Sequence, residues 1–235
     1  MPDAEHPAPE GTPAPITLDA LEARVLGCLI EKEATTPDVY PLSLNALVNA
    51  CNQKNNRAPV MELGEREVEG ALDRLRGKRL VTAFSGANAR AIKYKHRFGE
   101  RFPVEPLAQA MLAELMLRGP QTTAGLRGNC ERMATVPDLA GCEALLVHLT
   151  GGAEPLVRKL PRQPGQKEAR WVQLLTGEPT AEDLAGTEGA REPLKVAVAM
   201  TLPPEVETRL AALEAEVAGL KSELARLRMA LGETG

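Results

Sequence analysis

The order in which helix-like and strand-like segments follow one another restricts the fold of this chain more than any other feature of its sequence. Apolar residues repeat at helical spacing in three short segments, and each segment is ended by proline, glycine or a polar turn. Two runs typical of β-strands follow, with a turn between them. The same order then occurs a second time. We therefore expect a mainly α protein with small β-hairpins, in the α+β class, built from two similar units.

The first unit is predicted to span residues 17–100, and caps and apolar stripes place its three helices. Thr17 is expected to cap the first helix and Ser43 the second, because a hydroxyl oxygen can accept a hydrogen bond from a free backbone N–H at a helix start. The third helix is marked by an apolar stripe, formed by Val68, Leu72 and Leu75.

A β-hairpin is expected directly after the third helix. Its first strand is the run at residues 80–84, and a turn follows at residues 85–88. Apolar and basic residues alternate in the return strand, so Ile92 and Tyr94 are expected to face inward. The opposite, solvent-facing side then consists of Lys93, Lys95 and Arg97.

The second unit is predicted to span residues 101–176 and repeats this order. Its first helix should end at Gly119, Thr122 or Thr123 should cap the second helix, and Asp138 should cap the third. A second hairpin follows. Three helices and a hairpin are the order of a helix-turn-helix with a β-wing, so we predict two tandem winged-helix domains.

Three further segments lie outside these units. Residues 1–16 are predicted to be a disordered tail, residues 177–204 a linker, and residues 205–232 a coiled-coil helix. A parallel in-register pair of such helices would place opposite charges at its e and g positions, which favours a homodimer. An antiparallel pair, or one helix folded onto the chain's own core, would also bury the seam. The predicted dimer seam consists of Val206, Leu210, Leu213, Val217, Leu220, Leu224, Leu227 and Leu231.

Residues that carry catalytic or metal chemistry are scarce. The chain has four cysteines and three histidines, with no C-x-x-C pair and no histidine beside a cysteine. No common nucleophile, phosphate-loop or dinucleotide motif is present. Cys28, Cys51 and Cys142 fall among apolar residues and are expected to be buried. We therefore predict no metal site, no cofactor and no enzymatic activity.

Targeting signals are also missing from the sequence. No run of 18 apolar residues is present to span a membrane, and the first ten residues are acidic and proline-rich, without the apolar stretch of a secretory signal. These features predict a cytoplasmic protein without a membrane partner.

The net charge of −4 conceals a strongly basic segment. Both predicted domains are mildly basic, whereas the tail, linker and heptad segment are acidic. Residues 74–99 contain no Asp or Glu, which indicates phosphate contacts to double-stranded DNA. Lysines on a hairpin edge that only prevent aggregation are the alternative. The predicted nucleic-acid-binding residues are Arg74, Arg76, Lys78, Arg79, Arg90, Lys93, Lys95 and Arg97.

The third helix of the first unit argues against base reading. In a helix-turn-helix this helix enters the major groove by its first residues, and here Glu65, Glu67 and Glu69 occupy them. Carboxylates repel phosphates, whereas an acidic helix surface suits a protein partner. A protein-interaction scaffold that binds no DNA is therefore the alternative function.

Several motifs together are typical of one family. They are Glu31–Glu33, Thr35–Pro37, Tyr40–Leu47, Ala50–Lys54, Asn56–Val60, Lys93–Phe98 and Leu117–Thr122. With these motifs the chain resembles, over about residues 17–176, the YceH-like family of uncharacterised bacterial proteins. The resemblance implies tandem winged-helix domains and no established biochemical activity.

Overall fold

The computed structural model describes residues 16–85, 91–163, 165–180 and 209. The chain divides into two compact units, residues 1–194 and 195–235, and Arg209 is the one described position of the second unit. The predicted dimer seam, from Val206 to Leu231, lies outside the described residues, and so does Arg90. The seam and its dimer stay predictions.

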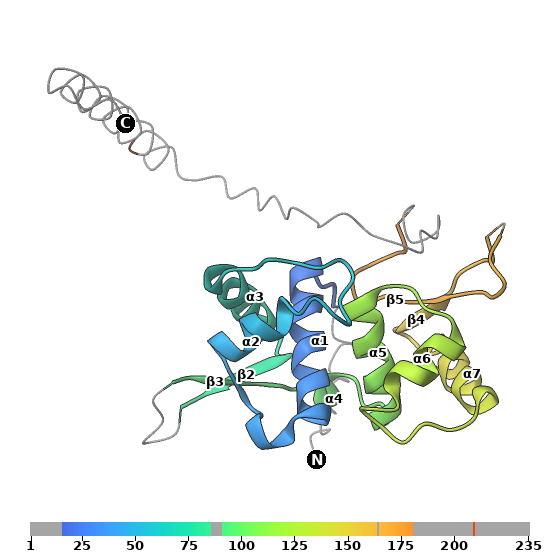
Figure 1. Cartoon of the computed structure of the whole chain (residues 1–235), viewed down its shortest axis with the longest axis horizontal. Helices are drawn as coiled ribbons and strands as arrows, with labels where there is room; N and C mark the ends of the chain where they lie inside the picture. The colour runs from blue at the N-terminus through green and yellow to red at the C-terminus, as the bar shows by residue number, and fades with distance from the viewer. Residues whose placement is uncertain (1–15, 86–90, 164, 181–208, 210–235) are drawn as a thin grey trace, which may run out of the picture. The chain divides into compact units, whose positions relative to one another are not determined.

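Helices dominate the described part of the first unit, and its first half also contains three short strands (Figure 1). That half contains α1 (Ala20–Thr35), the 3-10 helix η1 (Pro37–Val39), β1 (Leu42–Ser43), α2 (Leu44–Cys51), α3 (Glu65–Gly77), β2 (Val81–Phe84), β3 (Lys93–His96) and α4 (Phe98–Arg101). The second half contains α5 (Pro106–Arg118), α6 (Thr123–Cys130), α7 (Leu139–His148), β4 (Val157–Lys159) and β5 (Trp171–Gln173). The expected α+β class is confirmed.

The helix starts follow the predicted caps with one correction. Ser43, Thr122 and Asp138 each accept a hydrogen bond from a backbone N–H three residues ahead, as expected. Thr17 is not a cap. Asp19 caps α1 instead, because its carboxylate accepts from the Glu22 N–H while the Glu22 carboxylate accepts from the Asp19 N–H, both at 2.7 Å.

The first sheet has one strand more than the sequence predicts. Its strand order is β1-β3-β2, with antiparallel neighbours throughout. A two-residue strand such as β1 is too short to show periodicity, and the single turn of α4 was not predicted either. Ile92 was expected to face inward, but it precedes the first paired residue of β3 and its side chain is 52% exposed. Tyr94 is buried as expected.

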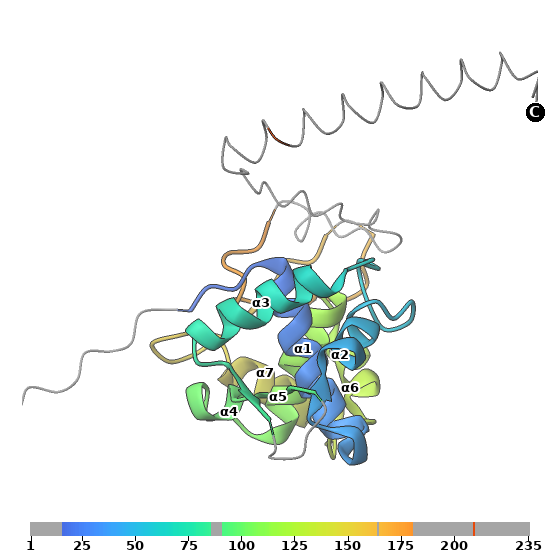
Figure 2. The ribbon, with the colours of Figure 1, turned by 90° about the vertical axis from the view of Figure 1, so that its left-hand side faces the viewer.

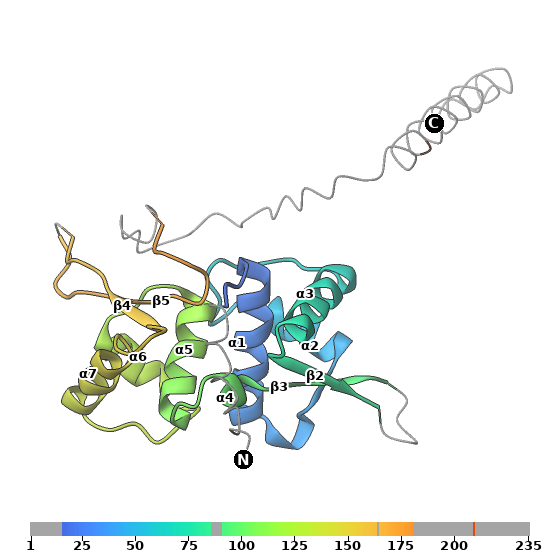
Figure 3. The same cartoon turned by 180° about the vertical axis from the view of Figure 1, so that it is seen from behind.

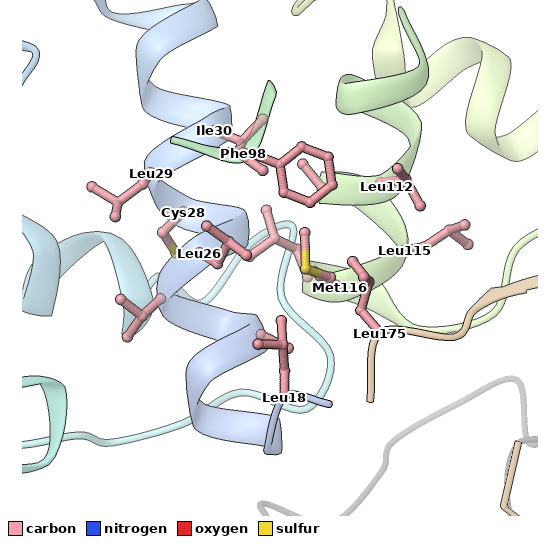
Figure 4. Close-up of a cluster of buried hydrophobic side chains, with 14 of the residues drawn as sticks. Leu18, Leu26, Cys28, Leu29, Ile30, Phe98, Leu112, Leu115, Met116 and Leu175 are labelled. Atoms are coloured by element: carbon pink, nitrogen blue, oxygen red, sulfur yellow. The ribbon is translucent and has the colours of Figure 1, made fainter. Parts of the chain in front are cut away.

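Helix α1 lies at the centre of this unit and packs against α5, α3 and α2 (Figures 1 and 2). Every residue from Leu21 to Glu31 is buried, because other elements cover the helix on all sides. Figure 4 shows Leu26 of α1 and Met116 of α5 within one apolar cluster. The hydrophobic core continues from the first half into the second, and the boundary predicted at residue 100 stays a prediction.

All four cysteines are free and buried, which confirms the expected burial of Cys28, Cys51 and Cys142. Among the described helices, none is both long enough and apolar enough to cross a membrane.

Candidate nucleic-acid interface

The basic block begins at the end of α3, where two of its cations form ion pairs with acids at the start of α1. Nη2 of Arg74 lies 2.9 Å from a carboxylate oxygen of Asp19, and Nζ of Lys78 lies 2.6 Å from one of Glu22. Lys78 also donates to the backbone carbonyl of Thr17. Both cations therefore fasten α3 to the start of α1, and their charges are neutralised by acids more than fifty residues away in the sequence.

Two more cations of the block form ion pairs with nearby acids. Arg76 lies 3.0 Å from Asp73, one turn earlier on α3. Arg97 is paired with Glu100, which lies just beyond the acid-free segment. Both pairs are exposed, and exposed pairs are weak, so these two arginines are less firmly held than Lys78.

The remaining described cations of the block are Arg79, Lys93 and Lys95, and within the part of the chain that the structure describes they form no ion pair. Arg79 and Lys95 are exposed and Lys93 is half-buried. Arg79 also has a φ of 59°, the left-handed conformation that glycine adopts most easily after a helix end. An arginine in this conformation costs about 1 kcal/mol of folding free energy relative to glycine. The backbone conformation therefore does not account for the presence of an arginine at this position.

The register of the hairpin decides which side chains share its open face. Phe84 of β2 pairs with Lys93 of β3, and Thr82 pairs with Lys95. Side chains of directly paired residues lie on the same face of a sheet. The open face therefore carries one aromatic ring and two lysines, whereas the alternate residues, including Tyr94 and His96, are buried on the other face. Figure 3 shows β2 and β3 side by side, extending away from the helices.

His96 anchors the buried face of the hairpin to α1 and to the loop before β1. Its Nδ1 accepts a hydrogen bond from the Phe98 N–H, and its Nε2 lies 2.8 Å from a carboxylate oxygen of Glu33. Its backbone N–H donates to the hydroxyl oxygen of Tyr40. Because Nδ1 accepts, the neutral ring carries its proton on Nε2, facing Glu33. Burial lowers the pKa of His96 below its ordinary value despite this carboxylate.

The acids predicted at the start of α3 lie on its exposed side. Glu65 and Glu69 are exposed, while Glu67 closes the helix start by accepting from the Gly64 N–H at 2.7 Å. Burial is the main cause that raises the pKa of Tyr94, and the negative charges of Glu69 and Asp73 raise it further. The α3 surface is therefore mixed in charge. Within the basic block, the described cations without ion pairs lie beyond the end of α3, at Arg79 and on the hairpin.

The second hairpin uses its charges internally. Arg158 is paired with Glu178 and Lys159 with Glu143. Nζ of Lys159 also lies 5.2 Å from the ring centroid of Trp171, which is buried and donates its indole N–H to Thr123. The charges of Arg158 and Lys159 are therefore neutralised within the protein.

A buried ionic cluster is the main feature that sequence reasoning missed. Glu31 of α1 is paired with Arg57, and Nη2 of Arg132 lies 2.6 Å from both Glu31 and Glu114 of α5. Burial alone would raise the pKa of Glu31, but the hydrogen bonds and positive charges of Arg57 and Arg132 together outweigh it and lower that pKa. The signal in the sequence was Glu31 directly after the apolar run Val25–Ile30, but Arg57, Arg132 and Glu114 are distant in the chain. Among the described residues no group of His, Cys, Asp and Glu could hold a metal ion.

Comparison with known proteins places the chain in a family. A family model described as "Protein of unknown function, DUF480" matches residues 18–166. The chain belongs to this family. Its relatives carry the name UPF0502 protein, and one from Citrifermentans bemidjiense is 53% identical over 74% of this chain and 81% of its own length. UPF0502 proteins from Geotalea uraniireducens and Aeromonas hydrophila are 50% and 45% identical, over 92% and 93% of this chain and 95% and 98% of their own lengths. The expected membership of a family of uncharacterised bacterial proteins is confirmed.

Proposed function

We propose that this protein is a non-enzymatic, cytoplasmic DNA-binding protein with two tandem winged-helix domains, related to the YceH-like proteins. Its first hairpin contacts the phosphate backbone of double-stranded DNA. One observation carries the proposal: Arg79, Lys93 and Lys95 form no ion pair within the described residues, although four neighbouring cations of the block do. Cations without internal partners are those that can displace counterions from DNA.

The proposal separates five of the eight predicted residues into two classes. Arg74 and Lys78 hold α1 and α3 together, so substituting them should lower stability as well as any DNA affinity. Arg79, Lys93 and Lys95 should affect DNA affinity alone. Sequence reading should be weak, because phosphate contacts carry no base information and the α3 surface is partly acidic.

Salt-dependent binding to a duplex of arbitrary sequence tests this proposal. Three phosphate contacts should give a slope of about −3 for log K against log salt concentration. A Lys93→Ala/Lys95→Ala variant should reduce the slope by about 2. The matched control is Lys54→Ala/Lys167→Ala, which removes two exposed lysines elsewhere and should leave the slope unchanged. Absence of binding at about 50 mM salt, or equal losses in both variants, contradicts the proposal.

A protein-interaction scaffold is the second candidate, and α7 gives it a specific observation. Leu139 and Val147 are 50% and 53% exposed on this helix, which corresponds in order to the third helix of a winged-helix unit. Apolar side chains there suit a protein partner better than DNA. If the scaffold function is correct, a stoichiometric partner should co-purify, a Leu139→Ser/Val147→Ser variant should lose it, and duplex DNA should not bind.

A further inference from the structure

The open face of the first hairpin carries an aromatic side chain whose exposure nothing in the fold explains. Phe84 is 44% exposed at the end of β2, whereas Phe98 and Phe102 pack ring against ring in the core, with centroids 4.9 Å apart. A half-exposed phenylalanine loses part of the free energy that burial would supply. Its ring can therefore act as a contact surface for a flat apolar ligand.

The neighbours of Phe84 indicate the charge of that ligand. Lys93 lies directly opposite on β3, and Lys95 follows two residues later on the same face. Neither lysine forms an ion pair within the described ranges, so a ligand that covers the ring meets two available positive charges. Glu69 and Asp73 lie near Tyr94, and Glu33 lies 2.8 Å from His96; both of these β3 side chains are on the opposite face. Glu100, which follows β3, is paired with Arg97.

The second hairpin gives an internal comparison. It also places an aromatic residue opposite a lysine, because Trp171 of β5 pairs with Lys159 of β4. There the ring is buried, and the lysine is neutralised by Glu143 and lies over that ring. The same pairing therefore serves packing in the second hairpin and leaves ring and charges available in the first.

We propose that Phe84 stacks on an unpaired nucleobase while Lys93 and Lys95 bind the phosphates beside it. An aromatic ring offers stacking to any base, and lysines supply the charge that a nucleic-acid strand needs at the adjacent backbone. The base must be unpaired, because Phe84 lies on a sheet face and the bases of an intact duplex are covered by their neighbours. This inference rests on the proposed DNA binding and assigns it a preferred substrate, a strand with an unpaired base.

The experiment measures anisotropy of three labelled ten-nucleotide probes at one salt concentration: oligothymidine, the same strand with abasic sites, and a perfect duplex. Phe84→Ala should weaken oligothymidine binding about tenfold and leave the abasic strand and the duplex unchanged. Phe84→Trp should restore affinity, and its exposed indole should be quenched by oligothymidine. Phe84→Leu controls for apolar contact without a π system and should bind as weakly as Phe84→Ala.

The possible failures are distinguishable. If Phe84→Ala binds oligothymidine as the unaltered protein does while Lys93→Ala/Lys95→Ala loses affinity, base stacking is wrong and phosphate contact stands. If Phe84→Ala weakens the perfect duplex equally, the ring contacts paired DNA and the assignment to an unpaired base is overturned. If no probe binds, both proposals fail. Circular dichroism of each variant establishes that it folds.

Discussion

The carboxylate of Glu31 accepts hydrogen bonds from both terminal nitrogens of Arg57, at 3.1 and 2.5 Å, and both side chains are buried. Arg57 has three further N–H groups, and they donate to the backbone carbonyls of Ala50 and Asn56 and to the side chain of Gln53. All five donors of the guanidinium are thus used. The pair fixes the loop after α2 against α1.

Removing Arg57 should destabilise the protein strongly. Arg57→Ala leaves the Glu31 carboxylate buried with Arg132 and Lys32 as its remaining close cations, and breaking one side of a buried pair typically costs about 3–5 kcal/mol. The free energy of unfolding in urea measures this loss. Arg57→Lys should recover only part of it, because an ammonium cannot form the forked pair of hydrogen bonds.

The matched control is Arg66→Ala, which removes an exposed arginine from α3. Its effect on the free energy of unfolding should stay within about 0.5 kcal/mol. A loss below about 1 kcal/mol for Arg57→Ala would show that the buried pair is balanced by its desolvation cost.

The stability of the protein should fall as pH decreases from about 7 toward 5, because of His96. Its pKa is lowered in the folded state, chiefly by burial, so the unfolded chain binds more protons in this range. The contribution of His96 is therefore complete above the unfolded pKa of about 6.5 and is lost as pH falls toward the folded pKa. The slope should not exceed about 1.4 kcal/mol per pH unit for this one group.

Urea unfolding at several pH values checks this expectation. His96→Gln should flatten the profile between about pH 7 and 5, since the substituted side chain does not titrate. His148→Gln, at an exposed position on α7, should keep the profile of the unaltered protein. An unchanged slope in His96→Gln would assign the pH dependence to other groups.

Replacing each of two glycines by alanine should change the stability of the protein in opposite directions. A Cβ at Gly27 of α1 would lie 3.0 Å from Cγ of Leu117 and 3.3 Å from Cβ of Met116, both on α5. Neither atom is the end of a flexible side chain, so the two helices must separate, and Gly27→Ala should cost about 1–2 kcal/mol after its gain in helix propensity. A Cβ at Gly128 of α6 meets nothing within 4 Å, and Gly128→Ala should stabilise by up to about 1 kcal/mol. Thermal unfolding measures the stability of both variants. If both substitutions stabilise the protein, the interface between α1 and α5 can accommodate a Cβ at Gly27 without separation of the helices.

Local signals predicted the local parts of this fold. Ser43, Thr122 and Asp138 cap their helices as expected because a cap depends on residues within one turn. Asp19 displaced Thr17 because it stands three residues before Glu22 and can form a reciprocal capping box, which a threonine at position 17 cannot. Ile92 was misplaced because alternation was extended one residue beyond the strand.

Sequence patterns could not predict contacts between residues that are far apart in the chain. The segment from residue 74 to 99 contains no acid, yet folding brings Asp19 and Glu22 of α1 to Arg74 and Lys78. Charge in the sequence therefore overstated the charge available at the surface. That Arg74 and Lys78 have partners on α1 could be learned only from the packing of α3 against α1.

The heptad segment is expected to pair two copies of this chain as a parallel coiled coil. Leu220 is assigned to a d position of the seam and Ser222 to an f position that faces solvent. Leu220→Lys places a charge in the seam and should convert the dimer to a monomer, whereas Ser222→Lys adds the same charge outside it and should leave the dimer intact. Light scattering of the full chain measures both masses. A monomer in the unaltered protein, or a dimer in Leu220→Lys, rejects the seam.

If the dimer is found, a second experiment distinguishes parallel from antiparallel pairing of the two helices. A disulfide should form between cysteines introduced at Leu213 of each copy only in a parallel in-register pair, because only that pair brings these equivalent positions together.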